Sequence, residues 1–332
     1  MSPDELEQSR TRRADRYRAP AARFRQKLLR RERLLFDVIC EAGARGCAFP
    51  TDAINVNAAA ATPDPRTHVA ADAYRVCGGR ASRRQTWDGA ARRLARRLAN
   101  ELESEATAER RPMYVLTAHA TIGLAPDCAV PRDPLLRAAW KAVVQTFAIL
   151  FPSTVKRLPR PEWVDRRLVS TLRREAAAGI RRGRRASGKR PGPEGRRLAV
   201  DPRLLALAAA ALGKQVSPDY VALYLIYTKP GDHFWPHPDD PKCAPINLFV
   251  CIDRKLPAGR SRGSAFLAFR PDGSVERYEL APGDALVFDG RGLVHGREPL
   301  RRGERVVLLS IWLNLREGAV APRAARPRSA AA

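Results

Sequence analysis

Three residues in the second half of the chain have the types and spacing of metal ligands. His237 and Asp239 form an H-x-D triplet just after a predicted strand, and His295 follows 58 residues after His237, beside another predicted strand. Residues i and i+2 of an extended segment point to the same side, so the triplet can present an imidazole and a carboxylate to one ion. In a rolled-up sheet, the distant strand can bring His295 to the same ion. Two histidines and one carboxylate leave three coordination positions open, the facial arrangement that suits non-haem Fe(II).

Short apolar runs separated by turn residues predict the strands that would position these ligands. The runs cover 221–228, 246–252, 264–269, 275–280, 285–288 and 305–315. Strands this close together, without helices between them, predict a sandwich or barrel rather than a parallel sheet. Arg305 opens the last run, ten residues after His295. Because a guanidinium pairs with a carboxylate through two hydrogen bonds, Arg305 can hold the distal carboxylate of a keto-acid whose other end binds the metal.

Residues 221–315 resemble the 2-oxoglutarate/Fe(II)-dependent dioxygenases, and most closely their prolyl 4-hydroxylase-like branch. The stretch YTKPGDHFWPHPD, which begins at Tyr227, matches the Tyr, Gly and H-x-D pattern of that branch. The stretch LAPGDALVFDGRGLVHGREPLRRGERVVLLSIWL matches its Pro-Gly-Asp turn, Phe, distal His, Gly, Arg and strand Trp. Trp312 follows Arg305 by seven residues, one more than the family pattern has.

This resemblance implies a double-stranded β-helix, which is a jelly-roll, cupin-like fold, with His237, Asp239 and His295 as iron ligands. It also implies that Arg305 pairs with the C5 carboxylate of 2-oxoglutarate and that Tyr227 hydrogen-bonds this cosubstrate. The implied cofactors are Fe(II), 2-oxoglutarate and O₂, with ascorbate as the reductant in an assay. The implied activity is that of a hydroxylase, which oxidises a C–H bond and releases succinate and CO₂. Asp239 favours this outcome, because related halogenases lack the carboxylate.

Three further residues near the triad are candidates for substrate binding: Trp235, His233 and Asn247. Alternation from His237 points Trp235 to the same face. Each candidate has an ordinary structural alternative, as a core aromatic residue, a loop histidine or a surface asparagine. The resemblance leaves the substrate open between a protein side chain of the prolyl type and an amino-acid-like small molecule.

The whole chain is expected to have an α+β organisation with supporting helices. We expect a basic, mainly helical N-terminal region of unknown role at 1–150, the dioxygenase domain at 151–318 and a disordered tail at 319–332. Apolar spacing predicts helices over 85–109, 132–151, 161–180 and 201–213. Gly, Pro and Arg residues predict a basic flexible loop at 181–197 within the dioxygenase domain, and composition also predicts a loop at 48–85.

The positive charge of the chain is unevenly distributed. The 332 residues carry a net charge of +25, but residues 216–318 contain 14 Lys+Arg against 13 Asp+Glu. The basic N-terminal region is therefore expected to meet an acidic or nucleic-acid partner, although a composition biased toward Arg and Ala explains the charge equally well. Two alternatives stay open: a nucleic-acid-associated oxygenase such as a demethylase, and a non-catalytic cupin-like module with a nucleic-acid-binding region. The demethylating branch has a second arginine six residues after the first, where this chain has Ile311.

Neither a membrane segment nor a disulfide framework is indicated. No run of about 18 uncharged apolar residues exists, and residues 1–18 lack the apolar stretch of a secretory signal. The six cysteines are scattered, with no C-x-x-C pair. We expect a cytoplasmic protein without membrane association, or a nuclear one if the source is eukaryotic.

Overall fold

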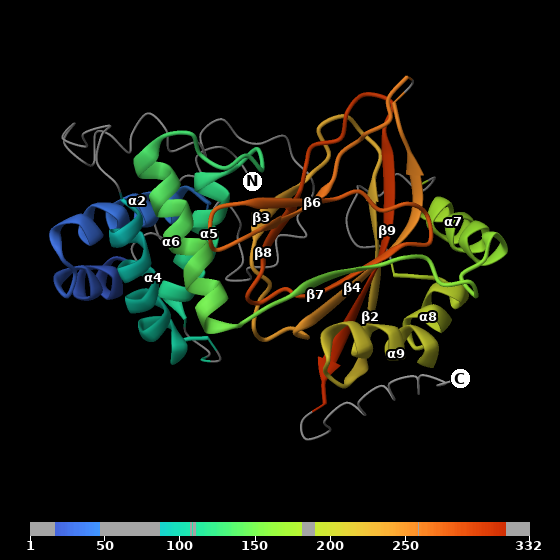
Figure 1. Cartoon of the computed structure of the whole chain (residues 1–332), viewed down its shortest axis with the longest axis horizontal. Helices are drawn as coiled ribbons and strands as arrows, with labels where there is room; N and C mark the ends of the chain where they lie inside the picture. Colours follow the sequence, from blue (N-terminus) through green and yellow to red (C-terminus); the bar gives the residue numbers. More distant parts are fainter. Residues whose placement is uncertain are drawn as a thin grey trace, which may run out of the picture.

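A computed structural model describes residues 17–46, 87–106, 108, 111–180, 190–257 and 259–316. Helices dominate up to about residue 151, and strands dominate the rest of the chain (Figure 1). The predicted loop at 48–85, the predicted tail at 319–332 and residues 181–189 of the predicted basic loop lie outside the described residues.

The helical region begins with a helical stretch at 17–26, and further helices follow it along the chain. They are α2 (Arg30–Gly46), α4 (Asp88–Glu103), α5 (Pro112–Leu124) and α6 (Pro134–Leu150). The leucines that recur every four residues on α4 are fully buried, as an amphipathic helix requires. Helix α5 is buried on nearly every side. A Cβ added at Gly123 would lie 2.1 Å from the carbonyl oxygen of Ala42, so glycine permits the close approach of α5 and α2.

The strands form two antiparallel sheets. They are β1 (Val155–Leu158), β2 (Val216–Tyr227), β3 (Phe234–His237), β4 (Ile246–Lys255), β5 (Phe266–Phe269), β6 (Val275–Tyr278), β7 (Ala285–Asp289), β8 (Val294–Arg297) and β9 (Arg305–Leu315). The five-stranded sheet has the order β1-β7-β4-β9-β2, and the four-stranded sheet has the order β3-β8-β5-β6. Apart from β1, this is the strand order of a jelly roll, the double-stranded β-helix. The predicted fold class is therefore confirmed.

Three helices cover the outer face of the five-stranded sheet. They are α7 (Arg166–Ile180), α8 (Pro193–Ala199) and α9 (Pro202–Leu212), and they share an apolar cluster with β2, β4, β7 and β9. Residues 193–197, which the sequence predicts as loop, belong to α8. The carboxylate of Glu175 on α7 accepts hydrogen bonds from the backbone N–H groups of Glu194 and Gly195, which satisfies the first turn of α8.

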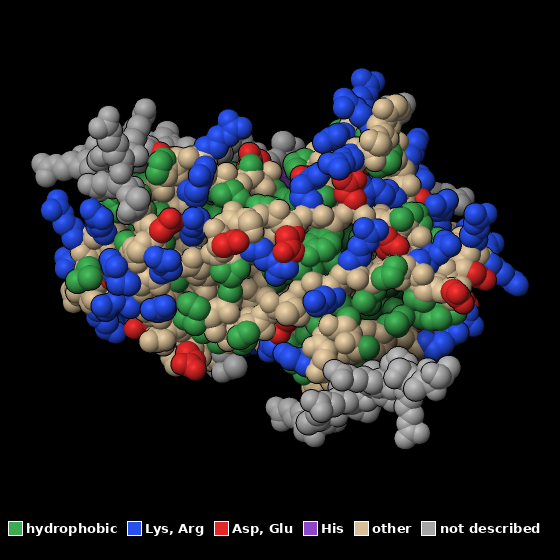
Figure 2. All heavy atoms as spheres, viewed as in Figure 1, with side chains coloured by type: hydrophobic (Ala, Val, Ile, Leu, Met, Phe, Trp, Pro, Cys, Tyr) green, Lys and Arg blue, Asp and Glu red, His purple; other side chains and the backbone are tan. Residues whose placement is uncertain are grey.

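The helical region covers the outer face of the other sheet. Leu267, Phe269 and Val294 of β5 and β8 belong to the same apolar cluster as α2, α4, α5 and α6. The rings of Trp140 on α6 and Phe269 have centroids 4.9 Å apart. Lys and Arg side chains gather over the helices at both ends of the face shown in Figure 2. No helix among the described residues is long and apolar enough to cross a membrane.

Candidate metal centre

The structure brings the three predicted metal ligands together at one end of the two sheets. His237 and His295 are directly paired across β3 and β8, and Asp239 follows β3. One ligand atom from each of the three residues lies within 4.8 Å of the other two. The Nε2 atoms of His237 and His295 are 3.6 Å and 3.9 Å from Asp239 Oδ1. All three residues are buried, so their polar atoms converge in a place where unpaired polar atoms are costly.

Backbone carbonyl groups fix the orientation of both imidazole rings. His237 Nδ1 lies 2.7 Å from the carbonyl oxygen of Trp235, and His295 Nδ1 lies 2.9 Å from that of Leu293. Each Nδ1 can therefore donate, which leaves Nε2 with a lone pair directed at the other ligands, as is usual for metal-bound histidine. Among the described residues, the buried Nε2 of His237 has no hydrogen-bond partner. A cation at the centre of the triad would satisfy it.

The carboxylate of Asp239 is held from two sides. The side-chain amide of Asn247, at the start of β4, donates a short hydrogen bond to Oδ2, which leaves Oδ1 turned toward the histidines. The backbone N–H of Asp239 donates to the carbonyl of Gly290 at 2.7 Å. A Cβ added at Gly290 would lie 1.6 Å from Asp239 Oδ2, so only glycine allows this loop to approach the carboxylate. Asn247, predicted as a substrate contact, therefore orients the carboxylate of the metal ligand Asp239.

The electrostatics of the triad favour the protonation states that a metal requires. Burial alone would raise the pKa of Asp239, but attraction to His295 and His237 and the hydrogen bond from Asn247 lower it below its usual value. Burial lowers the pKa of His295 to about 4, against the opposing attraction of Asp239. Near neutral pH the carboxylate is ionised and His295 is neutral. These are the forms that bind a divalent cation.

The donor set fits Fe(II). Two imidazole nitrogens on β3 and β8 and one carboxylate oxygen just after β3 make a three-ligand site with further coordination positions available, the pattern of non-haem Fe(II) centres. Ligand atoms about 2.1 Å from a metal lie about 3 Å from one another at right angles. The separations of 3.6 Å and 3.9 Å to Asp239 Oδ1 need only a small contraction to reach that geometry.

A buried arginine that the sequence reading missed lies beside the triad on the same strand. Arg297 is two residues after His295 on β8, so both side chains point to the same face. It is 4% exposed, its Cζ atom is 5.1 Å from the ring centroid of Tyr227, and Nη2 donates to Ser264 Oγ at 3.1 Å. Burial lowers its pKa. In the part of the chain that the structure describes, Arg297 forms no ion pair and its Nε has no partner, so an anion would be stabilised here.

Arg305 lies on the other face of its strand. On β9, Val306 belongs to the apolar cluster between the sheets, whereas Val307 packs against the helices outside. Arg305 has the orientation of Val307: its Nε is 2.6 Å from Asp253 Oδ2, and Asp253 also pairs with Arg173 on α7. The Arg305 side chain is 42% exposed. The structure does not bring the predicted cosubstrate arginine to the triad, because strand alternation directs it outward.

The remaining predicted residues lie around the triad at different depths. Tyr227 is buried beneath Arg297, and burial raises its pKa to about 12, so its hydroxyl stays protonated and can donate. The rings of His233 and Trp235 have centroids 5.7 Å apart. His233 is buried and its Nδ1 lies 2.8 Å from the carbonyl oxygen of Gly231, while its Nε2 has no partner among the described residues. Trp235 is half-buried.

The helical region contacts the ligand-bearing strands through directional polar groups. Arg111, just before α5, donates from both terminal nitrogens to the carboxylate of Asp240, the neighbour of Asp239, and both side chains are buried. Thr121 Oγ1 on α5 lies 2.5 Å from the carbonyl oxygen of Pro236 and 2.6 Å from that of Ala118, so its one hydroxyl proton is shared between β3 and α5. The thiol of Cys128 lies 3.3 Å and 3.2 Å from carbonyl oxygens on β3 and β8. These contacts hold the backbone on both sides of His237.

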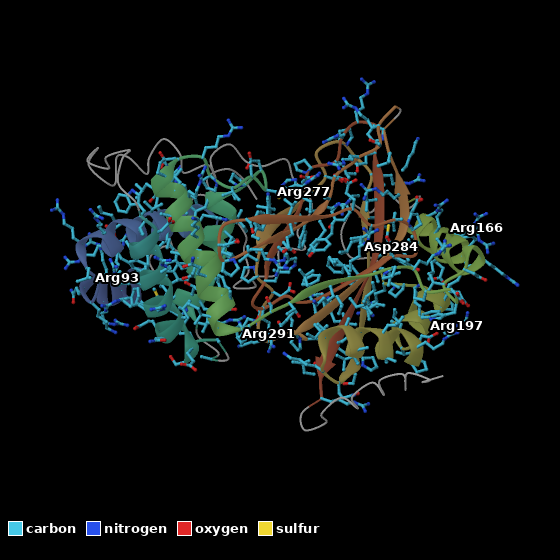
Figure 3. All side chains as sticks on the ribbon, viewed as in Figure 1. Arg93, Arg166, Arg197, Arg277, Asp284 and Arg291 are labelled. Carbon is cyan, nitrogen blue, oxygen red and sulfur yellow. The ribbon has the colours of Figure 1, made fainter. Side chains whose placement is uncertain are left out.

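The loop before β8 is also fixed against the helical region. Arg291, labelled in Figure 3 where the two halves of the molecule meet, pairs with Asp289 at 2.7 Å and lies over the ring of Phe151, 4.8 Å from its centroid. A Cβ added at Gly292 would lie 1.6 Å from the carbonyl oxygen of Phe151. The segment that leads to His295 is therefore packed closely against the end of α6.

Similarity to known proteins is found only among solved structures. No protein-family model matches the chain, and no curated protein matches it. Similar solved structures include AviO1 from Streptomyces viridochromogenes, with 21% identity over 51% of this chain and 92% of that chain and a TM-score of 0.39. A prolyl-4-hydroxylase from Pseudomonas putida has 20% identity over 53% of this chain and 94% of its own, with a TM-score of 0.37. SnoN, a non-haem α-ketoglutarate-dependent epimerase from nogalamycin biosynthesis, has 19% identity over 52% of this chain and 82% of its own, with a TM-score of 0.36. About half of this chain lies outside each of these similarities.

Proposed function

We propose that the protein is an Fe(II)- and 2-oxoglutarate-dependent oxygenase. The observation that carries this proposal is the position of Arg297, buried and without an ionic partner in the described structure, two residues along β8 from a His-Asp-His triad. Residues two apart on a strand are separated by about 6.6 Å. A five-carbon keto-diacid can span that separation, with its keto-acid end at the metal and its distal carboxylate at the guanidinium.

Each residue of the site then has a distinct task. His237, Asp239 and His295 would hold the iron, which together with the keto-acid supplies the oxidising chemistry. Arg297 binds the distal carboxylate of 2-oxoglutarate, and the protonated Tyr227 hydroxyl can donate a further hydrogen bond to it. The aromatic cluster between the sheets keeps water away from this pair.

The reaction we propose is hydroxylation of a C–H bond, with release of succinate and CO₂ from 2-oxoglutarate and consumption of O₂. Asp239 supports this outcome, because a carboxylate ligand occupies the position that a halide would need. The substrate classes consistent with the resemblance are a prolyl-type protein side chain and an amino-acid-like small molecule.

The test is a 2-oxoglutarate turnover assay with Fe(II), ascorbate and O₂, in which succinate is measured. We expect succinate from the wild-type protein and none from Asp239→Ala or His237→Ala. Absence of both succinate and iron binding in the wild-type protein would refute the proposal.

A matched pair of variants tests which arginine binds the cosubstrate. Arg297→Met should raise the KM for 2-oxoglutarate about 30-fold, since a charge-assisted hydrogen-bond pair contributes about 2 kcal/mol. Arg305→Met removes the same charge from the outer face and should leave this KM unchanged. The reverse result would return the role to Arg305.

A further inference from the structure

A cavity lies at the edge of the five-stranded sheet, between β2, the later residues of β9 and the segment that contains α8. Its volume is about 610 Å³, within the range of small-molecule pockets. Its walls include Pro218, Val221, Leu223, Trp312, Arg190 and Arg196. None of the triad residues lines this cavity, and neither does Arg297.

The side chain of Asn247 lies between Trp312 in the cavity wall and the metal ligand Asp239. Trp312 on β9 is the register partner of Asn247 on β4, and Asn247 donates to the carboxylate of Asp239. Residues directly opposite each other in an antiparallel pair point to the same face, with Cβ atoms about 5 Å apart. The indole of Trp312 therefore lies on the same inner face as Asn247, next to the triad.

The chemistry of the walls selects an anionic ligand with an apolar body. The indole and the aliphatic side chains of β2 form the apolar side. Arg190 and Arg196 form the basic side; both are exposed, and neither takes part in an ion pair within the described part of the chain. Arg196 Nη1 donates to the carbonyl of Pro191 at 3.0 Å, which holds its guanidinium near the cavity. Guanidinium groups bind carboxylates, sulfonates and phosphates through paired hydrogen bonds.

We infer that this cavity binds the substrate to be oxidised, and that this substrate is a small organic anion. Its apolar body lies against Trp312, and its anionic group lies between Arg190 and Arg196. This assignment rests on the proposed function for the reaction, but the ligand class follows from the walls of the cavity alone. It favours a small molecule over a prolyl side chain of a protein.

The ligand class can be tested on the metal-free protein, independently of activity. The probe is 8-anilinonaphthalene-1-sulfonate, an aromatic anion, and the neutral comparison is N-phenyl-1-naphthylamine; fluorescence titration gives both Kd values. We expect Arg190→Gln/Arg196→Gln to raise the Kd of the anion at least tenfold and to leave that of the neutral probe unchanged. The control is Arg166→Gln/Arg167→Gln, two exposed arginines on α7 without an ion pair among the described residues, which should change neither. Equal losses in both double variants would overturn the inference.

The position of the cavity is tested by paramagnetic broadening. With Mn(II) at the triad, the proton NMR lines of bound 8-anilinonaphthalene-1-sulfonate should broaden, and with Zn(II) they should not. Broadening should disappear in Asp239→Ala, although the probe still binds. Binding without broadening would show that the cavity is remote from the triad and would overturn its substrate role. Failure of the wild-type protein to bind Mn(II) would instead count against the proposed function, and the fluorescence result would still decide the ligand class.

Discussion

The two sheets of the jelly roll are covered by helices in different ways. Behind the four-stranded sheet, Arg111, Thr121 and Cys128 place hydrogen bonds on individual backbone or carboxylate groups around His237. Behind the five-stranded sheet, α7, α8 and α9 pack through a broad apolar cluster, and the ion pairs of Asp253 have half-exposed arginine partners. Directional contacts specify positions, whereas apolar contacts mainly supply stability.

The difference follows the location of the metal ligands. Strand β3 has only four residues and lies at the edge of its sheet, so neighbouring strands constrain it on one side only. An edge strand needs cover for its other side, and α5 supplies this cover together with a hydrogen bond to the carbonyl just before His237. Contacts from the helical region should therefore affect metal binding, and contacts behind the other sheet should not.

The largest expected effect comes from Arg111. Arg111→Met leaves the buried carboxylate of Asp240 without its partner, and this should lower the free energy of unfolding by about 3–5 kcal/mol. Mn(II) affinity at the triad should fall with it, because Asp240 adjoins Asp239. The control is Arg173→Met, behind the other sheet: this arginine is half-exposed and Asp253 keeps Arg305, so the loss should stay below about 1 kcal/mol. Urea unfolding and Mn(II) titration measure both quantities.

A double variant tests whether Arg111 affects metal binding by positioning Asp239 or only by stabilising the fold. Arg111→Met/Asp240→Leu removes both charges, so most of the lost stability should return. The weakened Mn(II) binding should not return, because the loop after His237 has lost its attachment. Full recovery of Mn(II) affinity would show that the ion pair supplies only stability.

The next effect is the pH dependence of the metal-free protein. The pKa of His295 is about 4 in the folded protein against 6.5 ordinarily, so between these values the unfolded chain binds a proton that the folded chain does not. Stability should therefore fall as the pH falls from 6.5 to 4, by up to about 3 kcal/mol from this group. Burial also lowers the pKa of His233, which adds a contribution of the same sign. Unfolding by urea across this range with a chelator present should show the slope, and His295→Gln should remove its larger part. If the stability of His295→Gln depended on pH as steeply as that of the wild-type protein, His295 would not be the source of the effect.

The smallest expected effect tests a single hydrogen bond. Thr121→Val leaves the buried carbonyl of Pro236 without the hydroxyl donor and should cost about 1–2 kcal/mol. Thr117→Val on the same helix is the control, because the Thr117 hydroxyl bonds only to the carbonyl of Met113 within α5. We expect the Thr121 variant alone to weaken Mn(II) binding. Equal effects of the two variants on Mn(II) affinity would show that the contact of Thr121 with the Pro236 carbonyl has no specific role in placing His237.

Local patterns in the sequence predicted a sandwich or barrel of short strands and the H-x-D pair, and the family resemblance implied the jelly roll and the complete triad. Alternating apolar runs and turn residues mark the strands, and the H-x-D spacing puts two ligands on one face whatever the surroundings. The distal His295 follows once the strands close into two sheets, since β8 pairs with β3. The predicted helices at 132–151 and 201–213 correspond closely to α6 and α9.

The expected spacing pointed to Arg305 as the arginine for the cosubstrate, but Arg305 lies on the outer face of its sheet. A strand has a period of two, so an offset of one residue moves a side chain to the opposite face. Trp312 follows Arg305 by seven residues, an odd number, and the two side chains therefore point to opposite sides of β9. The same rule applied forward from His295 would have selected Arg297, two residues later on the same strand.

The contribution of the helical region could not be predicted for a different reason. Helix α5 is apolar on all sides, so it has no amphipathic period to detect. Arg111 and Asp240 are 129 residues apart, and nothing local marks them as partners. Helix α8 lies partly in a segment whose Gly, Pro and Arg content favours loop, and it is stabilised by Glu175 from another helix.

Because an apolar cluster joins the helical region to β5 and β8, the jelly roll depends on the helices to cover one of its sheets. Leu267, Phe269 and Val294 are buried only because α6 and its neighbours lie over them. A gene rearrangement that passed on the jelly roll alone would produce a sheet with a bare apolar face, which favours aggregation. Transplanting this jelly roll into another protein would therefore require either the helices or polar replacements on that face.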